Sequence, residues 1–70
     1  MAEVRAEISA RVWQVSAEVG QQVAEGETLA ILESMKMEIP VESPIAGTVV
    51  AIKVSPNDQI QEGDLIALIE

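Results

Sequence analysis

The sequence predicts an all-β domain, a small sandwich or flattened barrel made of two similar halves. One observation is that short apolar runs alternate with turn residues along the chain, and no segment combines helical spacing with a cap. The other is an internal repeat, in which residues 8–33 align without a gap on residues 45–70. Since the chain has only 70 residues, we expect residues 1–70 to form one domain.

The apolar runs define the expected strands in order. Residues 2–8 alternate apolar and charged side chains, which indicates a strand with one buried face. Further strands are expected at residues 11–16, around Val23, at 28–34, 37–43 and 47–55, around Ile60, and at 65–69. Glycines and the Pro-Asn-Asp segment at 56–58 mark the turns between them. Val12 and Trp13 are expected to anchor the second strand, with Trp13, the only aromatic residue, as a core plug.

The repeat relates the two halves by an offset of 37 residues, the difference between positions 45 and 8. Gly26 aligns with Gly63, and Gly20 aligns with Asn57, a residue type that also tolerates positive φ. Each half has one hydrophobic face, so two halves packed around a pseudo-two-fold axis bury both faces. The first copy ends at Glu33 and the second at the C-terminus. We therefore expect the segment after Glu33 to lie at the end of the domain opposite the chain termini.

The most unusual local feature is the segment Glu-Ser-Met-Lys-Met-Glu at 33–38. It joins two strand-like runs so closely that they read as a β-hairpin with Met35 and Lys36 at the tip. Two-residue hairpin turns favour Asn-Gly, Asp-Gly or glycine pairs because these turns need positive φ. Another side chain in the left-handed region costs roughly 1–2 kcal/mol per residue. A local rule broken here, in a chain that otherwise obeys its rules, indicates a functional site at Lys36.

The composition excludes several classes of function. The net charge of −8 repels nucleic-acid phosphates, so no nucleic-acid partner is expected. The absence of cysteine and histidine removes disulfides, thiolate metal sites and the usual general base, and we expect a protein that is not itself an enzyme. No apolar stretch is long enough to span a membrane, and the N-terminus lacks the apolar segment of a signal peptide. A cytoplasmic protein is expected, and the high charge favours a monomer.

Four segments resemble the biotinyl/lipoyl attachment domains, and the resemblance covers nearly the whole chain. The segment at 33–38 is similar to the biotin acceptor motif, in which Ala or Ser precedes Met-Lys-Met. Ser-Pro-Ile-Ala-Gly at 43–47 resembles the family segment that follows it. Val-Ala-Glu-Gly-Glu at 23–27 and Ile-Gln-Glu-Gly-Asp at 60–64 resemble the paired turns of the family. The combination is specific because Met-Lys-Met stands at the centre of the repeat.

The resemblance implies a fold and a carrier function. The fold would be a hammerhead sandwich of two four-stranded antiparallel sheets. Lys36 would be joined to biotin by a biotin protein ligase and would carry carboxyl groups between biotin carboxylase and carboxyltransferase components. The chain looks like the small stand-alone biotin carrier proteins.

The residues that flank Lys36 are the candidates for recognition by the ligase. Met35 and Met37 are unbranched and polarizable, and would offer an apolar handle on either side of the amine. Met37 is also in phase with Ile39 and Val41, so a core-facing position is an equal alternative. Glu33 and Glu38 would steer recognition electrostatically, with ordinary solubility of strand ends as the alternative. Ser34 completes the set as part of the acceptor motif.

Other interpretations stay open. Lipoate on Lys36, in a dehydrogenase complex, would use the same fold, although lipoyl tips more often have Asp-Lys-Ala or Asp-Lys-Val. Attachment of both cofactors, biotin and lipoate, is a further alternative. An unmodified hammerhead that serves as a binding or structural module would need only the repeat. Lys53 is interpreted as an ordinary strand residue because it aligns with Ser16 and not with any hairpin tip.

Overall fold

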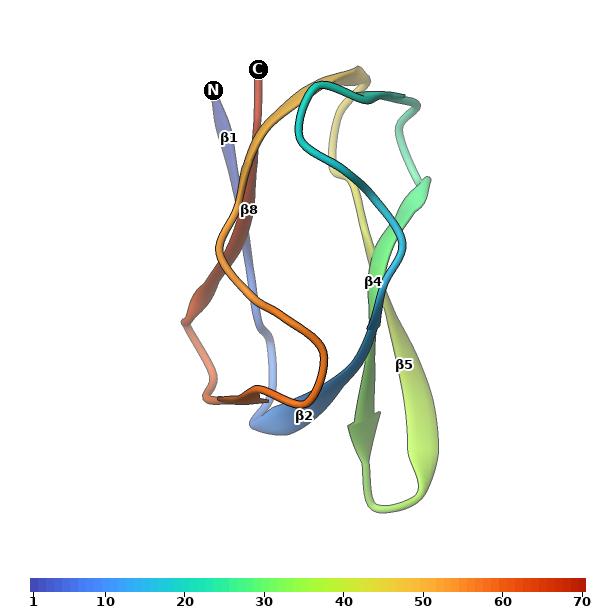
Figure 1. Ribbon diagram of the computed structural model, residues 1–70, viewed down its shortest axis with the longest axis vertical. Helices are drawn as coiled ribbons and strands as arrows, with labels where there is room; N and C mark the ends of the chain where they lie inside the picture. The colour runs from blue at the N-terminus through green and yellow to red at the C-terminus, as the bar shows by residue number, and fades with distance from the viewer.

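The computed structural model describes residues 1–70 as an all-β domain with eight strands (Figure 1). The strands are β1 (Ala2–Arg5), β2 (Ala10–Val15), β3 (Gln22–Val23), β4 (Thr28–Ser34), β5 (Met37–Glu42), β6 (Gly47–Ile52), β7 (Gln59–Ile60) and β8 (Leu65–Ile69). They form two four-stranded antiparallel sheets, with strand orders β1-β8-β6-β3 and β5-β4-β2-β7. The predicted fold class is therefore confirmed. The fold contains no helix long and apolar enough to cross a membrane.

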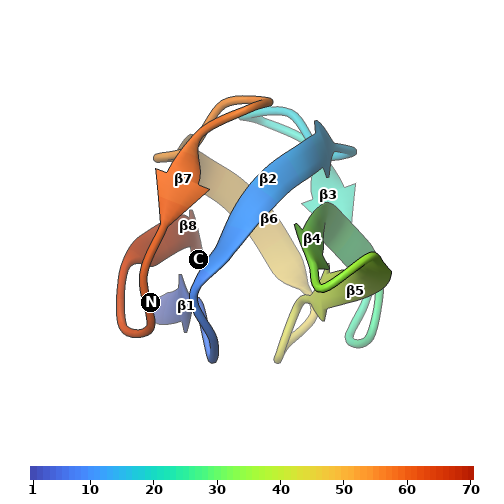
Figure 2. The ribbon, with the colours of Figure 1, turned by 90° about the horizontal axis from the view of Figure 1, so that it is seen from below.

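The two sheets face each other across one small core. Viewed along the long axis, β1 and β8 lie on one side and β4 and β5 on the other, while β2 and β6 cross between them (Figure 2). Both sheets contribute large side chains that are almost fully buried, namely Val12, Leu29, Leu32, Val49, Ile66 and Ile69. Because each sheet has one apolar face, neither could hide it from water without the other. Burial of such side chains is worth about 1.5–3 kcal/mol each.

Strand pairing confirms the pseudo-two-fold relation and extends it. In the first half, Leu32 pairs with Val12 on one side and with Ile39 on the other. In the second half, Ile69 pairs with Val49 and with Ala2 in the matching register. Adding 37 to the positions of β2 and β4 gives those of β6 and β8, and subtracting 37 from the positions of β5 gives those of β1. The repeat therefore includes β1 and β5 as well as the aligned residues 8–33 and 45–70.

The turns repeat in the same way. Gly26 N–H donates to the Ser43 carbonyl at 2.8 Å, and Gly63 N–H donates to the Ala6 carbonyl at 2.8 Å. Gly20 and Asn57 both have positive φ, at 93° and 76°, as the alignment predicted. Asn57 can occupy this position because its short polar side chain is tolerated in the left-handed region.

Two expected strands are longer in the prediction than in the structure. The first strand ends at Arg5 and not at Ile8, because the register with β8 shifts between Val4 and Arg5 and the chain then turns toward β2. Ile8 is consequently 38% exposed. The strand that begins at Gly47 ends at Ile52 and not at residue 55.

The prediction that Trp13 plugs the core is wrong. Val12 is fully buried, whereas Trp13 is 45% exposed. Neighbouring residues of a strand point to opposite faces of its sheet, so Val12 and Trp13 could not both face the core. A β-bulge between Val12 and Gln14 then places Gln14 on the outside as well and returns Val15 to the core. Trp13 therefore lies on the outer face of the sheet.

Candidate functional site

The candidate site is the turn between β4 and β5. Ser34 pairs with Met37 as the last cross-strand pair, and Met35 and Lys36 form the two-residue turn beyond it. Their φ angles are 52° and 64°, so both central residues occupy the left-handed region. Positive φ at both positions is the signature of a type I′ turn, whose twist matches that of the flanking strands. The sequence prediction of a strained, glycine-free hairpin tip is confirmed.

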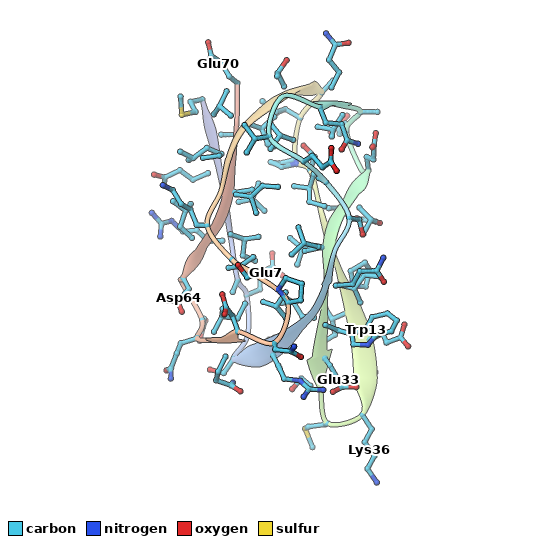
Figure 3. The ribbon with its side chains drawn as sticks, in the orientation of Figure 1. Glu7, Trp13, Glu33, Lys36, Asp64 and Glu70 are labelled. Carbon is cyan, nitrogen blue, oxygen red and sulfur yellow. The ribbon has the colours of Figure 1, made fainter.

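The hairpin holds this turn at one end of an elongated molecule. The domain measures 31 × 17 × 17 Å. The β4–β5 hairpin extends beyond the other turns at one end, and both termini lie at the opposite end (Figure 1). The Lys36 side chain points away from the sheets (Figure 3). An enzyme can therefore approach the amine without displacing any other part of the chain.

The methionines on either side of Lys36 are also exposed. Met35 is 91% exposed and Met37 is 65% exposed. Met37 follows the same alternation as Ile39 and Val41, which pack partly against the core. The hairpin, however, runs past the end of the core, so nothing covers Met37. Of the two interpretations of this residue, the structure supports the exposed one.

The acidic residues at the base of the turn differ in their surroundings. Glu33 and Glu38 are a direct cross-strand pair, an arrangement that is unfavourable for like charges. Arg11 on β2 offsets this repulsion, since its guanidinium donates to Glu33 Oε1 at 2.6 Å. Both partners are about half exposed, so the ion pair is worth no more than about 1 kcal/mol. Glu33 thus has a structural partner, whereas Glu38 is exposed and makes no ion pair. Ser34 is half-buried and ends β4.

Of the four cationic side chains, the two arginines are engaged and the two lysines are not. Arg5 is held by Glu3 and by the Gly63 carbonyl, and Arg11 is held by Glu33. Lys53 is exposed but lies just after β6, where its backbone N–H donates to the Ile66 carbonyl at 2.8 Å. Lys36 is the only amine on a projecting turn.

The arrangement can supply one nucleophile and nothing to activate it. No histidine or cysteine is present, and no carboxylate makes an ion pair with Lys36. A catalytic site needs a nucleophile, a base within hydrogen-bond reach and a group that orients the base. The tip therefore presents an exposed primary amine that no ion-pair partner in the chain engages.

Sequence reasoning missed two features close to the tip. One is the Arg11–Glu33 ion pair, which depends on the pairing of β2 with β4. The other is the exposed Trp13 on the same sheet. Side chains alternate between the two faces of a strand, so an inward Val12 predicts an outward Trp13. This alternation was the signal that could have placed Trp13 on the outer face of the sheet.

The positive φ of the turn gives a direct prediction for Met35→Gly. Glycine relieves the strain of the left-handed conformation, and little packing is lost because the side chain is 91% exposed. Glycine also makes the unfolded chain more flexible, which lowers the stability of the folded state and offsets part of this relief. We therefore expect a net increase of about 0.5–1 kcal/mol in the free energy of unfolding. In a domain of this size, the gain raises the Tm by about 2–8 °C.

Thermal unfolding followed by circular dichroism measures this shift. Met35→Ala is the matched control, since it removes the exposed side chain but keeps the Cβ that causes the strain. An equal rise in Tm for both variants would contradict the assignment of strain to this position.

Comparison with known proteins gives a consistent result. A family profile described as Biotin-requiring enzyme matches residues 2–69. The "Biotinylated protein TB7.3 homolog" of Mycobacterium leprae (strain TN) is 56% identical over 67 residues, which cover 96% of this chain and 94% of the relative. The "Biotin/lipoyl attachment protein" of Bacillus subtilis (strain 168) is 38% identical over 63 residues, or 90% of this chain and 86% of the relative. Among solved structures, Kluyveromyces lactis urea carboxylase matches 99% of this chain with a TM-score of 0.93 at 33% identity, using 6% of its own length.

Proposed function

This chain belongs to the Biotin-requiring enzyme family, and from that premise we propose that it carries biotin covalently on Lys36. The observation that carries the proposal is the unpaired Lys36 amine at a type I′ turn that projects from the end of the domain. The name of the M. leprae relative as a biotinylated protein supports biotin over lipoate. The methionines on both sides of Lys36 support the same choice.

The attachment step needs only the amine from this chain. The unprotonated Nζ of Lys36 attacks the acyl carbon of biotinyl-adenylate held by a biotin protein ligase. A C–N bond forms, the C–O bond to the phosphate breaks, and AMP leaves with the electron pair while the amine gives up a proton. Lysine suits the step because its amine forms a stable amide and its four-carbon stem is flexible. The modification removes one positive charge and makes the net charge of −8 one unit more negative.

The carrier function follows from the position of the amine. When attached, biotin supplies a ureido ring that accepts a carboxyl group at one active site and donates it at another. Lys36 tethers that ring to a compact domain, which converts encounters with a free cofactor into encounters at a high effective concentration. The hairpin presents the tether at one end and leaves the rest of the surface free for contacts with the enzymes.

The partners that this role requires are a biotin protein ligase and the biotin carboxylase and carboxyltransferase components of a biotin-dependent carboxylase. The occurrence of a domain of the same fold in K. lactis urea carboxylase supports a carboxylase system. A monomeric carrier is consistent with the net charge of −8, which disfavours self-association.

Intact-mass spectrometry tests the proposal. The purified chain is incubated with ATP and either a biotin ligase with biotin or a lipoyl ligase with lipoate. We expect the mass of one biotinyl group to be added and peptide mapping to place it on Lys36. A gain with lipoate alone would support the lipoyl alternative, and no gain with either ligase would favour an unmodified interaction module.

The flanking methionines give a second prediction under the same proposal. In the variant with Met35→Ala and Met37→Ala, we expect the kcat/KM for biotinylation to fall by about 10-fold or more, because the apolar handle on both sides of the amine is lost. Both side chains are largely exposed, so the free energy of unfolding should change by no more than about 0.5 kcal/mol.

Ligation rates and urea unfolding curves measure the two effects on the same samples. Val19→Ala is the matched control, because Val19 is 63% exposed and lies between β2 and β3, outside the lysine hairpin. Ligation at the wild-type rate in the double variant would rule out the methionines as recognition elements.

A further inference from the structure

An exposed apolar surface lies on the sheet that carries the lysine hairpin. Gln14, Ile31 and Pro40 are aligned across β2, β4 and β5, and Trp13 lies beside Gln14 at the bulge. Ile31 points outward because Ala30 and Leu32 on either side of it are buried, and Pro40 is exposed between the half-buried Ile39 and Val41. We call the outward residues Trp13, Ile31 and Pro40 the Trp13 face.

The Trp13 face lies close to the acceptor turn. Met35 is four residues beyond Ile31, immediately after the end of β4, which corresponds to about 13 Å at the rise of a strand. The charged row of Arg11, Glu33 and Glu38 separates the two. Trp13, Glu33 and Lys36 follow one another down the same side of the molecule (Figure 3). A partner protein that binds the turn can therefore contact the Trp13 face at the same time, in a single orientation.

The internal symmetry provides a reference surface for judging whether the fold itself requires this face. The equivalents of Trp13, Ile31 and Pro40 in the second half are Val50, Leu68 and Glu3, on the outer face of the sheet that ends at the chain termini. A bulge occurs at the equivalent place, between Val49 and Ala51. Backbone and core are thus alike in both halves, yet the large aromatic residue occurs only beside Lys36. The equivalent bulge carries valine in the second half, so the backbone at this position does not itself require tryptophan.

We propose that the Trp13 face is the docking surface for the biotin ligase that acylates Lys36, an inference that rests on the proposed function. A ligase must hold the Lys36 amine at its own active site, and the lysine stem is only four carbons long. It must therefore contact the protein surface around the turn. A standard interface covers about 800 Å² on each partner, a patch of about 16 Å radius, which reaches the Trp13 face from the turn.

The chemistry of the face defines the complementary surface of the ligase. Tryptophan and arginine are the residues most enriched at energetic hot spots, and Trp13 lies on the same strand as Arg11. Glu38 is exposed without a partner on a chain of net charge −8. We expect the ligase to offer an apolar pocket for the indole of Trp13 with basic groups at its rim.

Steady-state ligation kinetics with a biotin protein ligase test the proposal. For Trp13→Ala we expect the kcat/KM to fall at least 10-fold. The fall should come from a rise in KM, while kcat stays within about twofold of wild type. The split is expected because Trp13 binds the enzyme but does not touch the reacting atoms. Trp13→Phe should recover most of the loss, since it restores an aromatic side chain.

Val50→Ala is the matched control, because it truncates the equivalent bulge residue on the face away from Lys36, and its KM should stay within twofold of wild type. Labelling of Lys36 by the N-hydroxysuccinimide ester of biotin should proceed at one rate in all variants, which shows that the amine and its turn are intact. An unchanged KM for Trp13→Ala, or an equal rise for Val50→Ala, overturns the inference and leaves the proposed function standing. A wild-type chain that the ligase does not modify overturns both.

Discussion

Replacement of Lys36 by arginine is expected to abolish ligase-dependent biotinylation, with the rate falling at least 100-fold to the limit of detection. Arginine keeps the positive charge and a long flexible stem. Its guanidinium stays protonated in proteins, so it offers no nucleophilic lone pair to the acyl donor. The variant therefore removes the reacting atom while it preserves the electrostatics of the tip. Intact-mass spectrometry after incubation with ligase, ATP and biotin measures the result.

Lys53→Arg is the matched control, because it makes the same substitution at the only other lysine of the chain. Lys53 lies just after the end of β6 and not at a projecting turn, so biotinylation should proceed at the wild-type rate. Mass gain that survives in Lys36→Arg and disappears in Lys53→Arg would transfer the acceptor role to Lys53 and refute the proposed function of the tip.

The second large effect is expected from Leu32→Ala. Leu32 is 1% exposed and pairs with both Val12 and Ile39 at the base of the hairpin. Removal of a buried leucine side chain costs about 2–5 kcal/mol, from lost burial and from the cavity left behind. The whole stability of a domain of this size is about 4–10 kcal/mol. Leu32→Ala should therefore remove a large part of it, and we expect a marked fall in the urea midpoint.

Ile31→Ala is the control for this prediction. It shortens the adjacent residue of the same strand, but Ile31 faces outward and is only half-buried. Its cost should be about 1 kcal/mol or less, since solvent fills the space that the side chain vacates. Equal losses of stability in the two variants would contradict the assignment of inner and outer faces in β4.

The two variants also separate presentation of the amine from stability of the domain. Lys36→Arg should unfold like the wild type, because the side chain makes no contact with the sheets. Leu32→Ala should still be biotinylated under conditions in which it is folded, because the turn itself is unchanged.

Much of the architecture could be predicted from local sequence. The alternation of apolar and polar residues fixed which segments are strands, since a strand with one buried face requires that period. The offset of 37 residues predicted two halves, and the arithmetic of where each copy ends placed the lysine hairpin away from the termini. The two-residue connection between the strand-like runs predicted the positive φ of Met35 and Lys36, and the absence of glycine and asparagine there predicted that the turn would be strained. Each inference depends only on residues that are near in sequence or on the comparison of the two copies.

Other features were decided by the tertiary structure alone. The exposure of Trp13 depends on Val12 taking the inward place in β2, and the exposure of Met37 depends on the hairpin running past the core. The ion pair of Arg11 with Glu33 depends on the register of β2 against β4. The hydrophobic pattern of a strand indicates that one of its faces is buried. It does not indicate where the opposite sheet ends or which strand pairs alongside. The sequence by itself determined the lysine turn and the two halves of the fold. The packing of one half on the other determined which surfaces beside that turn stay exposed.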